Sequence, residues 1–259
     1  MQKPKHIHFS ADFIEKQIAY IHSPHALETA KNIIACKLRN SRFLLSGFAQ
    51  ARKRTRDQSF KGIESFQMNI FRAEEMLAKA ATSSEIFLAE AQGSRAYWKA
   101  VSFICKRDSA WKRVYPHATD ELNILLNTGY TLLAKRVFTL LESARIMPEL
   151  GFLHGNTSGD ALVYDLMECF RQPLVDASLF PLFSRLRKHN SSITEKTFKR
   201  GFSFLTRQYD KRIRYHAKCE TMNRIIALEI YRLKQSVEEN KIWKPYQYGW
   251  GHSMRCTRK

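Results

Sequence analysis

Three acidic residues and one histidine have the types and spacing that could do chemistry. Glu90 lies among apolar residues within a predicted helix, 85–105, where a carboxylate is costly unless it is paired or binds a cation. Asp165 and Glu168 are three residues apart and therefore share one face of a predicted helix, where two acids repel unless a cation lies between them. His154 lies in a glycine-flanked loop just before that helix, where it can reach a cleft.

Taken together, these four residues predict a site for a hard divalent cation. Carboxylates with one imidazole suit Mg²⁺ or Mn²⁺ better than zinc, and no Cys-x-x-Cys pair is present. Such an ion can bridge a scissile phosphate and stabilise the leaving oxygen. Spacing alone does not bring the four together, and each has a structural alternative: salt bridges for the acids, and a packed or solvated loop position for the histidine.

The charge of the chain indicates a polyanionic partner. Its 43 Lys and Arg residues exceed its 24 Asp and Glu residues, giving a net charge of +19. Nucleic acid is the natural ligand of such an excess, although a merely basic protein is the alternative. The residues predicted to contact DNA are Arg52, Arg54, Lys112, Arg113, Arg185, Arg187, Lys188, Arg207, Arg212 and Arg214. For any single cluster among them, a solvated surface is the competing interpretation.

The elements that must position these residues are predicted to be helices. With only 10 Gly and 7 Pro in 259 residues, the chain has too few turn formers for many short strands. Apolar residues recur at helical spacing, and strand-like alternation is not apparent. The predicted helices are 11–22, 25–45, 60–81, 85–105, 120–145, 160–186 with kinks before Pro173 and Pro181, 194–214 and 217–239. The predicted fold class is therefore all-α, with a basic loop or helix end at 51–58 and a basic loop at 106–118.

The remaining features bear on location. No apolar run is long enough to span a membrane, and the N-terminus lacks the apolar core of a signal peptide. The five cysteines are scattered and are expected to be reduced thiols. We therefore expect a cytoplasmic protein with no membrane partner.

Several motifs, in order, resemble those of a known family. They are Glu90 followed seven residues later by Tyr97; Asn123, Asn127 and Gly129-Tyr130 in the next helix; Gly151-Phe-Leu-His154; and Leu162-x-x-Asp165-Leu-x-Glu168-x-Phe-Arg171, closed by Val175-Asp176. Lys37-x-x-Asn40 upstream and Trp243-Lys-Pro-Tyr246 downstream fit the same pattern. Over about 25–246 the chain resembles the CRISPR-associated spacer-acquisition integrases, the integrase and endonuclease subunit of CRISPR adaptation.

The resemblance implies a multi-helix catalytic domain of the CRISPR integrase type and assigns roles within it. Glu90, His154 and Asp165 match the family's metal-binding and catalytic triad, and Glu168 matches a nearby second acid of the metal site. The implied cofactor is Mg²⁺ or Mn²⁺. Tyr97, Asn127 and Tyr130 are expected either beside the metal ligands or facing DNA, with helix packing as the alternative.

The implied reaction is metal-dependent transesterification. The 3′-hydroxyl of a short DNA fragment attacks a phosphodiester at the leader–repeat end of a CRISPR array, which serves antiviral defence. Implied partners are double-stranded DNA, further copies of the chain and the family's small ferredoxin-like adaptation protein. A non-catalytic basic DNA-binding protein, a structure-selective nuclease and a transposon-type integrase are the alternatives.

The domain organisation departs from the family at the N-terminus. Members usually begin with a β-rich domain that builds the dimer, whereas here about 24 residues with a helical pattern precede the shared part. We predict a helical arm or linker at 1–24, the integrase domain at 25–246 and a basic tail at 247–259. The departure puts the usual dimer and the need for the small partner in doubt.

Overall fold

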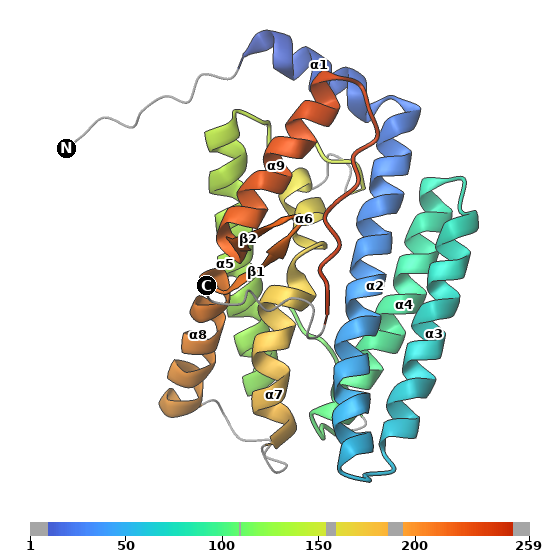
Figure 1. Ribbon diagram of the computed structural model, residues 1–259, viewed down its shortest axis with the longest axis vertical. Helices are drawn as coiled ribbons and strands as arrows, with labels where there is room; N and C mark the ends of the chain where they lie inside the picture. The colour runs from blue at the N-terminus through green and yellow to red at the C-terminus, as the bar shows by residue number, and fades with distance from the viewer. Residues whose placement is uncertain (1–9, 109, 154–158, 186–193, 251–259) are drawn as a thin grey trace, which may run out of the picture.

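The computed structural model describes residues 10–108, 110–153, 159–185 and 194–250, and helices dominate these residues. One layer contains α2 (Pro24–Arg54), α3 (Phe60–Lys79) and α4 (Ser83–Ile104), which stand side by side, while α1 (Ala11–Ile21) runs across the top of the view to the start of α2 (Figure 1). The fold class is all-α, as the sequence predicts.

Local sequence explains why this layer forms. Thr82 and Glu85 make a capping box at the start of α4, in which each side chain satisfies a backbone N–H group of the other residue. Gly93 of α4 lets that helix approach α2, because a Cβ atom there would lie 2.3 Å from Leu38 Cδ2. The close approach of α4 to α2 fixes the spacing between Glu90 and the residues of α2 that face it.

A second layer is built around α5 (Glu121–Ala144), whose Leu125, Leu133 and Val137 are fully buried. Packed with it are α6 (Ala161–Met167), α7 (Ala177–Arg185), α8 (Glu195–Tyr209) and α9 (Met222–Glu238). The kink expected before Pro173 is a π-helical segment, Arg171–Asp176, between α6 and α7. Proline lacks the N–H group that a regular helix would use, so the hydrogen-bond register changes there.

The helix predicted over 194–214 is wrong at its C-terminal end, and that predicted over 217–239 is wrong at its start. The chain instead forms an antiparallel hairpin of β1 (Arg212–Tyr215) and β2 (Lys218–Thr221) between α8 and α9. Ile213 and Tyr215 point inward while their neighbours are exposed, a strand pattern too short to detect by alternation. In addition, α2 continues beyond the predicted end at residue 45 to Arg54, so the stretch 51–58 begins as a helix end, one of its two predicted forms.

Two further expectations can be compared with the structure. Cys36, Cys105 and Cys169 are buried free thiols, but Cys219, on the partly exposed hairpin, is disulfide-bonded, which corrects the expectation that every cysteine is reduced. Within the described parts of the chain, no helix is long and apolar enough to cross a membrane.

An extended segment after α9 ties the end of the described chain to its beginning. It runs alongside α2 (Figure 1), and the Tyr20 hydroxyl donates to Lys241 O at 2.9 Å. The Trp243 N–H group donates to Thr29 Oγ1 at 3.2 Å, and Asn32 Nδ2 donates to Trp243 O at 3.1 Å. The Trp243 side chain is 1% exposed, so it is the main apolar anchor of this segment.

Replacing Trp243 with alanine should therefore lower the free energy of unfolding by about 3–5 kcal/mol, the usual cost of emptying a large buried aromatic site. Urea denaturation followed by circular dichroism measures it. Tyr231→Ala, at a 57% exposed position on α9, is the matched control and should change stability little. Equal effects of the two substitutions would contradict this account of the anchor.

Candidate functional site

The structure brings Glu90 and Glu168 together on one ammonium group. Lys37 Nζ, from α2, lies 2.5 Å from Glu90 Oε1 and 3.0 Å from Glu168 Oε2. The side chains of Lys37, Glu90 and Glu168 are 12%, 20% and 3% exposed. Two carboxylates from α4 and from the end of α6 therefore meet at one point that a cation occupies.

Neighbouring residues hold Glu168 at this point. Arg171, in the first turn of the π-helical segment, places NH1 3.2 Å from Glu168 Oε1. Asn40 is fully buried one turn after Lys37, and its Nδ2 donates to Cys169 O at 3.0 Å. Asn40 thus ties α2 to the backbone beside Glu168, which fixes the distance that Lys37 must bridge.

Asp165 lies in a different environment from the other two acids. Its Oδ2 accepts hydrogen bonds from the N–H groups of Phe152 at 2.5 Å and Leu153 at 3.1 Å. A Cβ atom at Gly151 would lie 2.8 Å from this oxygen and from the backbone of Ala161, so glycine is required there. Asp165 therefore fixes the loop that leads directly into position 154; His154 itself lies outside the described residues.

The donor set fits a divalent cation in part. Two carboxylates whose oxygens contact one ammonium nitrogen are close enough to share a metal ion, and Mg²⁺ and Mn²⁺ prefer such oxygen ligands. Among the described residues no group of three His, Cys, Asp or Glu side chains converges. A third protein ligand would have to come from elsewhere, and His154 is the predicted one.

Another buried carboxylate orders the helices behind this site. Asp176 is fully buried and accepts the hydroxyls of Tyr97 at 2.5 Å and Tyr130 at 2.7 Å. The Tyr130 ring lies beneath the guanidinium groups of Arg171 and Arg113, at 5.0 and 5.3 Å from its centroid. Tyr97 and Tyr130 thus connect the core to the cations beside Glu168.

Asn127 and Asn123 shape the loop before α5. Arg113 NH2 lies 2.5 Å from Asn127 Oδ1, and Asn127 Nδ2 donates to the carbonyls of Val114 and Pro116. Asn123 accepts from Arg113 NH1 at 3.0 Å and donates to Lys112 O at 2.8 Å. Burial lowers the pKa of Arg113 from its ordinary value. Asn127 therefore positions Arg113.

This loop closes one side of a cavity of about 350 Å³ that reaches Arg171. The cavity combines aromatic side chains with cations: its lining includes Trp98, Arg113, Tyr115, Tyr130, Lys135, Tyr164 and Arg171. Aromatic faces stack on nucleobases and cations attract phosphates. The cavity is therefore chemically suited to a nucleic-acid strand next to the carboxylates.

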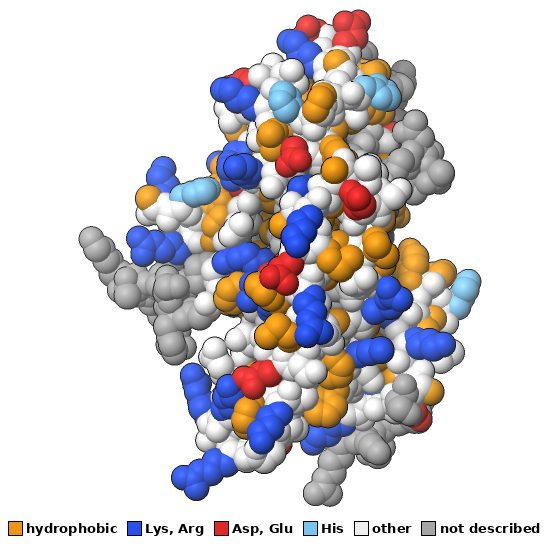
Figure 2. Space-filling model, turned by 90° about the vertical axis from the view of Figure 1, so that its right-hand side faces the viewer, with side chains coloured by type: hydrophobic (Ala, Val, Ile, Leu, Met, Phe, Trp, Pro, Cys, Tyr) orange, Lys and Arg blue, Asp and Glu red, His pale blue; other side chains and the backbone are white. Residues whose placement is uncertain are grey.

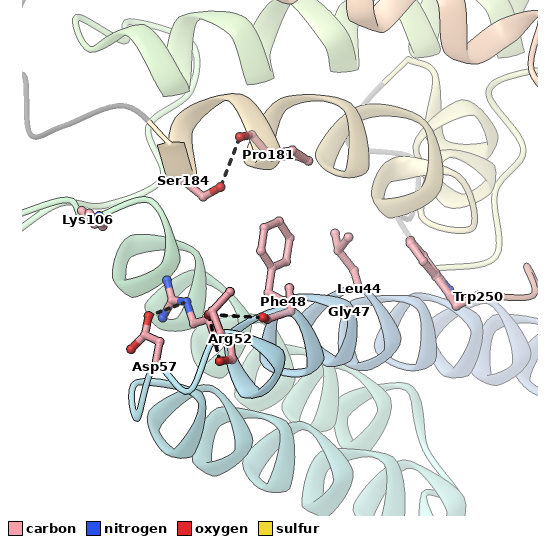
Figure 3. A pocket seen from close by; sticks show the side chains of 11 residues that line it. Leu44, Gly47, Phe48, Arg52, Asp57, Lys106, Pro181, Ser184 and Trp250 are labelled. Carbon is pink, nitrogen blue, oxygen red and sulfur yellow. Dashed lines mark hydrogen bonds and ion pairs between the residues drawn. The ribbon is translucent and has the colours of Figure 1, made fainter. Parts of the chain in front are cut away.

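A separate cavity of about 540 Å³ lies between α2 and α7 (Figure 3). Leu44 and Phe48 point from α2 toward α7, and Trp250 closes one end. At the other end Arg52 contacts Asp57 and donates to Ser59 Oγ and Ile104 O, while Lys106 is exposed. Arg52, predicted to contact DNA, is thus engaged within the protein.

The other predicted DNA contacts divide into three groups. Arg54, Lys112, Arg207, Arg212 and Arg214 are exposed on α2, the loop before α5, α8 and β1. Arg185 ends α7 without a described side chain, and Arg187 and Lys188 lie outside the described residues. Figure 2 shows Lys and Arg side chains spread over the face on the α3 and α4 side, with fewer acidic ones.

Three residues of the site have no role predicted from the sequence: Lys37, Arg171 and Asp176. The detectable signal is a charged residue on the apolar face of a helix: Lys37 follows Ile33 and Ile34 at helical spacing. A lysine on such a face requires an acidic partner, but helical spacing does not identify which acid it is.

Asp176 should give the protein a pH-dependent stability. Burial raises its pKa from 3.8 to about 6, although the two tyrosine hydroxyls oppose this shift. The folded state therefore holds the proton more tightly, so the group stabilises most below its ordinary pKa, and this contribution is lost as the pH rises through about 6.

We expect the stability of the parent relative to Asp176→Asn to fall by about 2 kcal/mol between pH of about 4 and 7. Urea unfolding across this range measures the difference. Asp57→Asn is the control, because a hydrogen bond with Ser59 lowers the pKa of Asp57 and its difference should move in the opposite direction. A difference that stays constant with pH would refute the assignment.

Comparison with known proteins identifies the family. A family model described as CRISPR associated protein Cas1 matches residues 3–216. The CRISPR-associated endonuclease Cas1 1 of Francisella tularensis subsp. novicida is 25% identical over 228 residues, covering 87% of this chain and 70% of that protein. The protein of the same name from Saccharolobus solfataricus is 37% identical over 105 residues, covering 39% of this chain and 30% of its own length.

The fold agrees with this result. A casposase bound to an integration product superposes with a TM-score of 0.71 over 90% of this chain and 70% of that chain, at 20% sequence identity. The family model covers the motifs around Lys37, Glu90 and Glu168 that form the site described above. The chain therefore belongs to the CRISPR associated protein Cas1 family.

Proposed function

We propose that this chain is a metal-dependent DNA integrase and endonuclease that inserts short DNA fragments into a CRISPR array. One observation carries the proposal: in a chain of the Cas1 family, Glu90 and Glu168 direct oxygens at a single cation position. The names of its relatives, Cas1 endonucleases and a casposase bound to an integration product, support the same chemistry.

Glu90, Glu168 and His154 would hold Mg²⁺ or Mn²⁺. The resemblance places Asp165 in the metal triad, but its hydrogen bonds to Phe152 and Leu153 favour a positioning role. By fixing the loop that enters position 154, Asp165 would direct His154 toward the carboxylate pair. When bound, the ion would supply charge stabilisation for the transition state and Lewis-acid activation of the attacking oxygen.

The proposed reaction is a transesterification. The 3′-hydroxyl oxygen of the fragment forms a bond to the target phosphorus, and the bond from phosphorus to the target's 3′-oxygen breaks. The attacking hydroxyl loses its proton and the leaving oxygen gains one, so charge and atoms balance. Water in place of the hydroxyl gives hydrolysis, which is the endonuclease activity.

The aromatic and basic cavity beside Arg171 would hold the DNA strand. Trp98 and Tyr115 offer ring faces to bases, while Lys135 offers a charge to phosphate. Double-stranded DNA is the proposed partner, together with further copies of the chain and the small ferredoxin-like adaptation protein.

The first test is a strand-transfer assay with a 3′-overhang duplex and a supercoiled plasmid that carries a CRISPR array. Glu90→Gln and Glu168→Gln should each lower metal-dependent joining by about 100-fold or more, because each removes a carboxylate that would hold the metal ion. Asp165→Asn should lower it by about 10- to 100-fold, as expected for a residue that orients a ligand.

Glu74→Gln is the matched control, since Glu74 pairs with Arg42 away from the carboxylate pair. It should leave joining unchanged. DNA binding that survives in chelator, with no joined product from any variant or from the parent, would instead support a non-catalytic DNA-binding protein.

DNA affinity should depend strongly on salt. Several phosphate contacts predict that affinity for duplex DNA falls by at least about 100-fold between about 50 and 200 mM salt. Replacing exposed Arg207 and Arg214 with alanine should make the slope of log affinity against log salt shallower, by the amount expected for the loss of about two phosphate contacts. Fluorescence anisotropy measures both, and a flat salt response in the parent would contradict phosphate binding.

A further inference from the structure

Lys37 occupies the position where a metal ion would meet the two carboxylates. Its Nζ atom contacts Glu90 Oε1 and Glu168 Oε2, and its side chain is only 12% exposed. We propose that Lys37 is a built-in counter-ion that competes with the divalent cation, so that metal binding requires its ammonium group to leave the carboxylate pair. The inference rests on the proposed function of this pair as a metal site.

The geometry makes the two cations exclusive. Carboxylate oxygens bind Mg²⁺ at about 2.0–2.1 Å, which places the ion inside the hydrogen-bond sphere that Nζ now fills. An ammonium group that remained on the same two oxygens would also lie against a doubly charged ion in a weakly screened environment. Exchange of one cation for the other relieves both conflicts.

The charge balance of the site explains why a lysine is needed without the metal. Two carboxylates, one of them 3% exposed, would repel each other if left alone. Of these two acids, Arg171 forms an ion pair with Glu168, whereas Lys37 is the cation that the described structure places between both acids. The ammonium thus keeps the pair close together and ready for a metal ion.

The two cations differ in their freedom to move. Arg171 is fixed from two sides, by Glu168 and by the face of the Tyr130 ring. Lys37 carries a point charge on a flexible four-carbon chain, and Glu90 beside it is 20% exposed. Lys37 can therefore withdraw toward the exposed side of the pair, where a DNA phosphate would approach, without a change in the helices.

Mn²⁺ binding to the purified chain in the absence of DNA tests the inference. The signal of free Mn²⁺ in electron paramagnetic resonance gives the dissociation constant for the parent and for Lys37→Met. Removing the competing charge should tighten Mn²⁺ binding by about tenfold or more. Lys135→Met removes a charge from the neighbouring cavity without touching the pair, and should change the constant by less than about twofold.

The outcomes separate this inference from the proposed function. Mn²⁺ binding that is lost in Glu168→Gln but equal or weaker in Lys37→Met would overturn the competition and leave the metal site intact. Binding that is absent from the parent and from both variants, or that persists in Glu168→Gln, would overturn the metal site and the inference together. If Lys135→Met tightens Mn²⁺ binding as much as Lys37→Met does, the effect comes from the net charge of the protein, and the competition is overturned.

A measurement on the unaltered protein covers the case in which Lys37→Met does not fold. Reductive methylation followed by mass spectrometry reports how accessible each lysine amine is. Saturating Mg²⁺ should raise the labelling of Lys37 severalfold, because its ammonium leaves the carboxylates, while labelling of Lys135 stays constant. Labelling of Lys37 that does not change with Mg²⁺ would overturn the inference.

Discussion

The contact of two carboxylates with one ammonium group is the constraint on which the rest of the site depends. Glu90, Glu168 and Lys37 come from three different elements, and their contact requires α2, α4 and α6 to keep fixed separations. Buried ion pairs seldom stabilise a protein more than apolar side chains of the same size would. The arrangement is therefore best explained by the chemistry that it prepares, and the surrounding packing supplies the stability that it lacks.

Around the site, the same kind of contact recurs: a buried polar side chain joins two structural elements. Asn40 joins α2 to the backbone at Cys169, Asp165 joins α6 to the loop at 152–153, and Asp176 joins α4 to α5 through two tyrosines. Each such group is costly to bury unless its partners are in place. The site is consequently held by directional contacts, which specify position more sharply than apolar packing does.

The sequence predicts the helices well and the contacts between them poorly. Helical spacing locates α3, α4 and α5 because each buries a long apolar stripe. The hairpin at Ile213 and Tyr215 is not predicted, because its strands are too short to show alternation of apolar and polar residues. Among the candidate ligands, Glu90 and Glu168 contact the same ammonium group, whereas Asp165 accepts backbone hydrogen bonds. Helical periodicity does not distinguish Asp165 from Glu168, because both lie on one helix face. The difference arises from the loop at Gly151, whose path is a tertiary feature.

The extended segment that ends at Trp250 has a consequence for how the protein is made. Its residues bind Tyr20, Thr29 and Asn40, which the ribosome produces more than two hundred residues earlier. The α2–α4 layer has mostly local contacts and can form as it emerges, but the apolar site on it that Trp243 fills stays open until the ribosome has produced the later segment. A nascent or prematurely terminated chain therefore exposes an apolar surface on α2. Chaperones and proteases that recognise incompletely folded proteins can bind this surface.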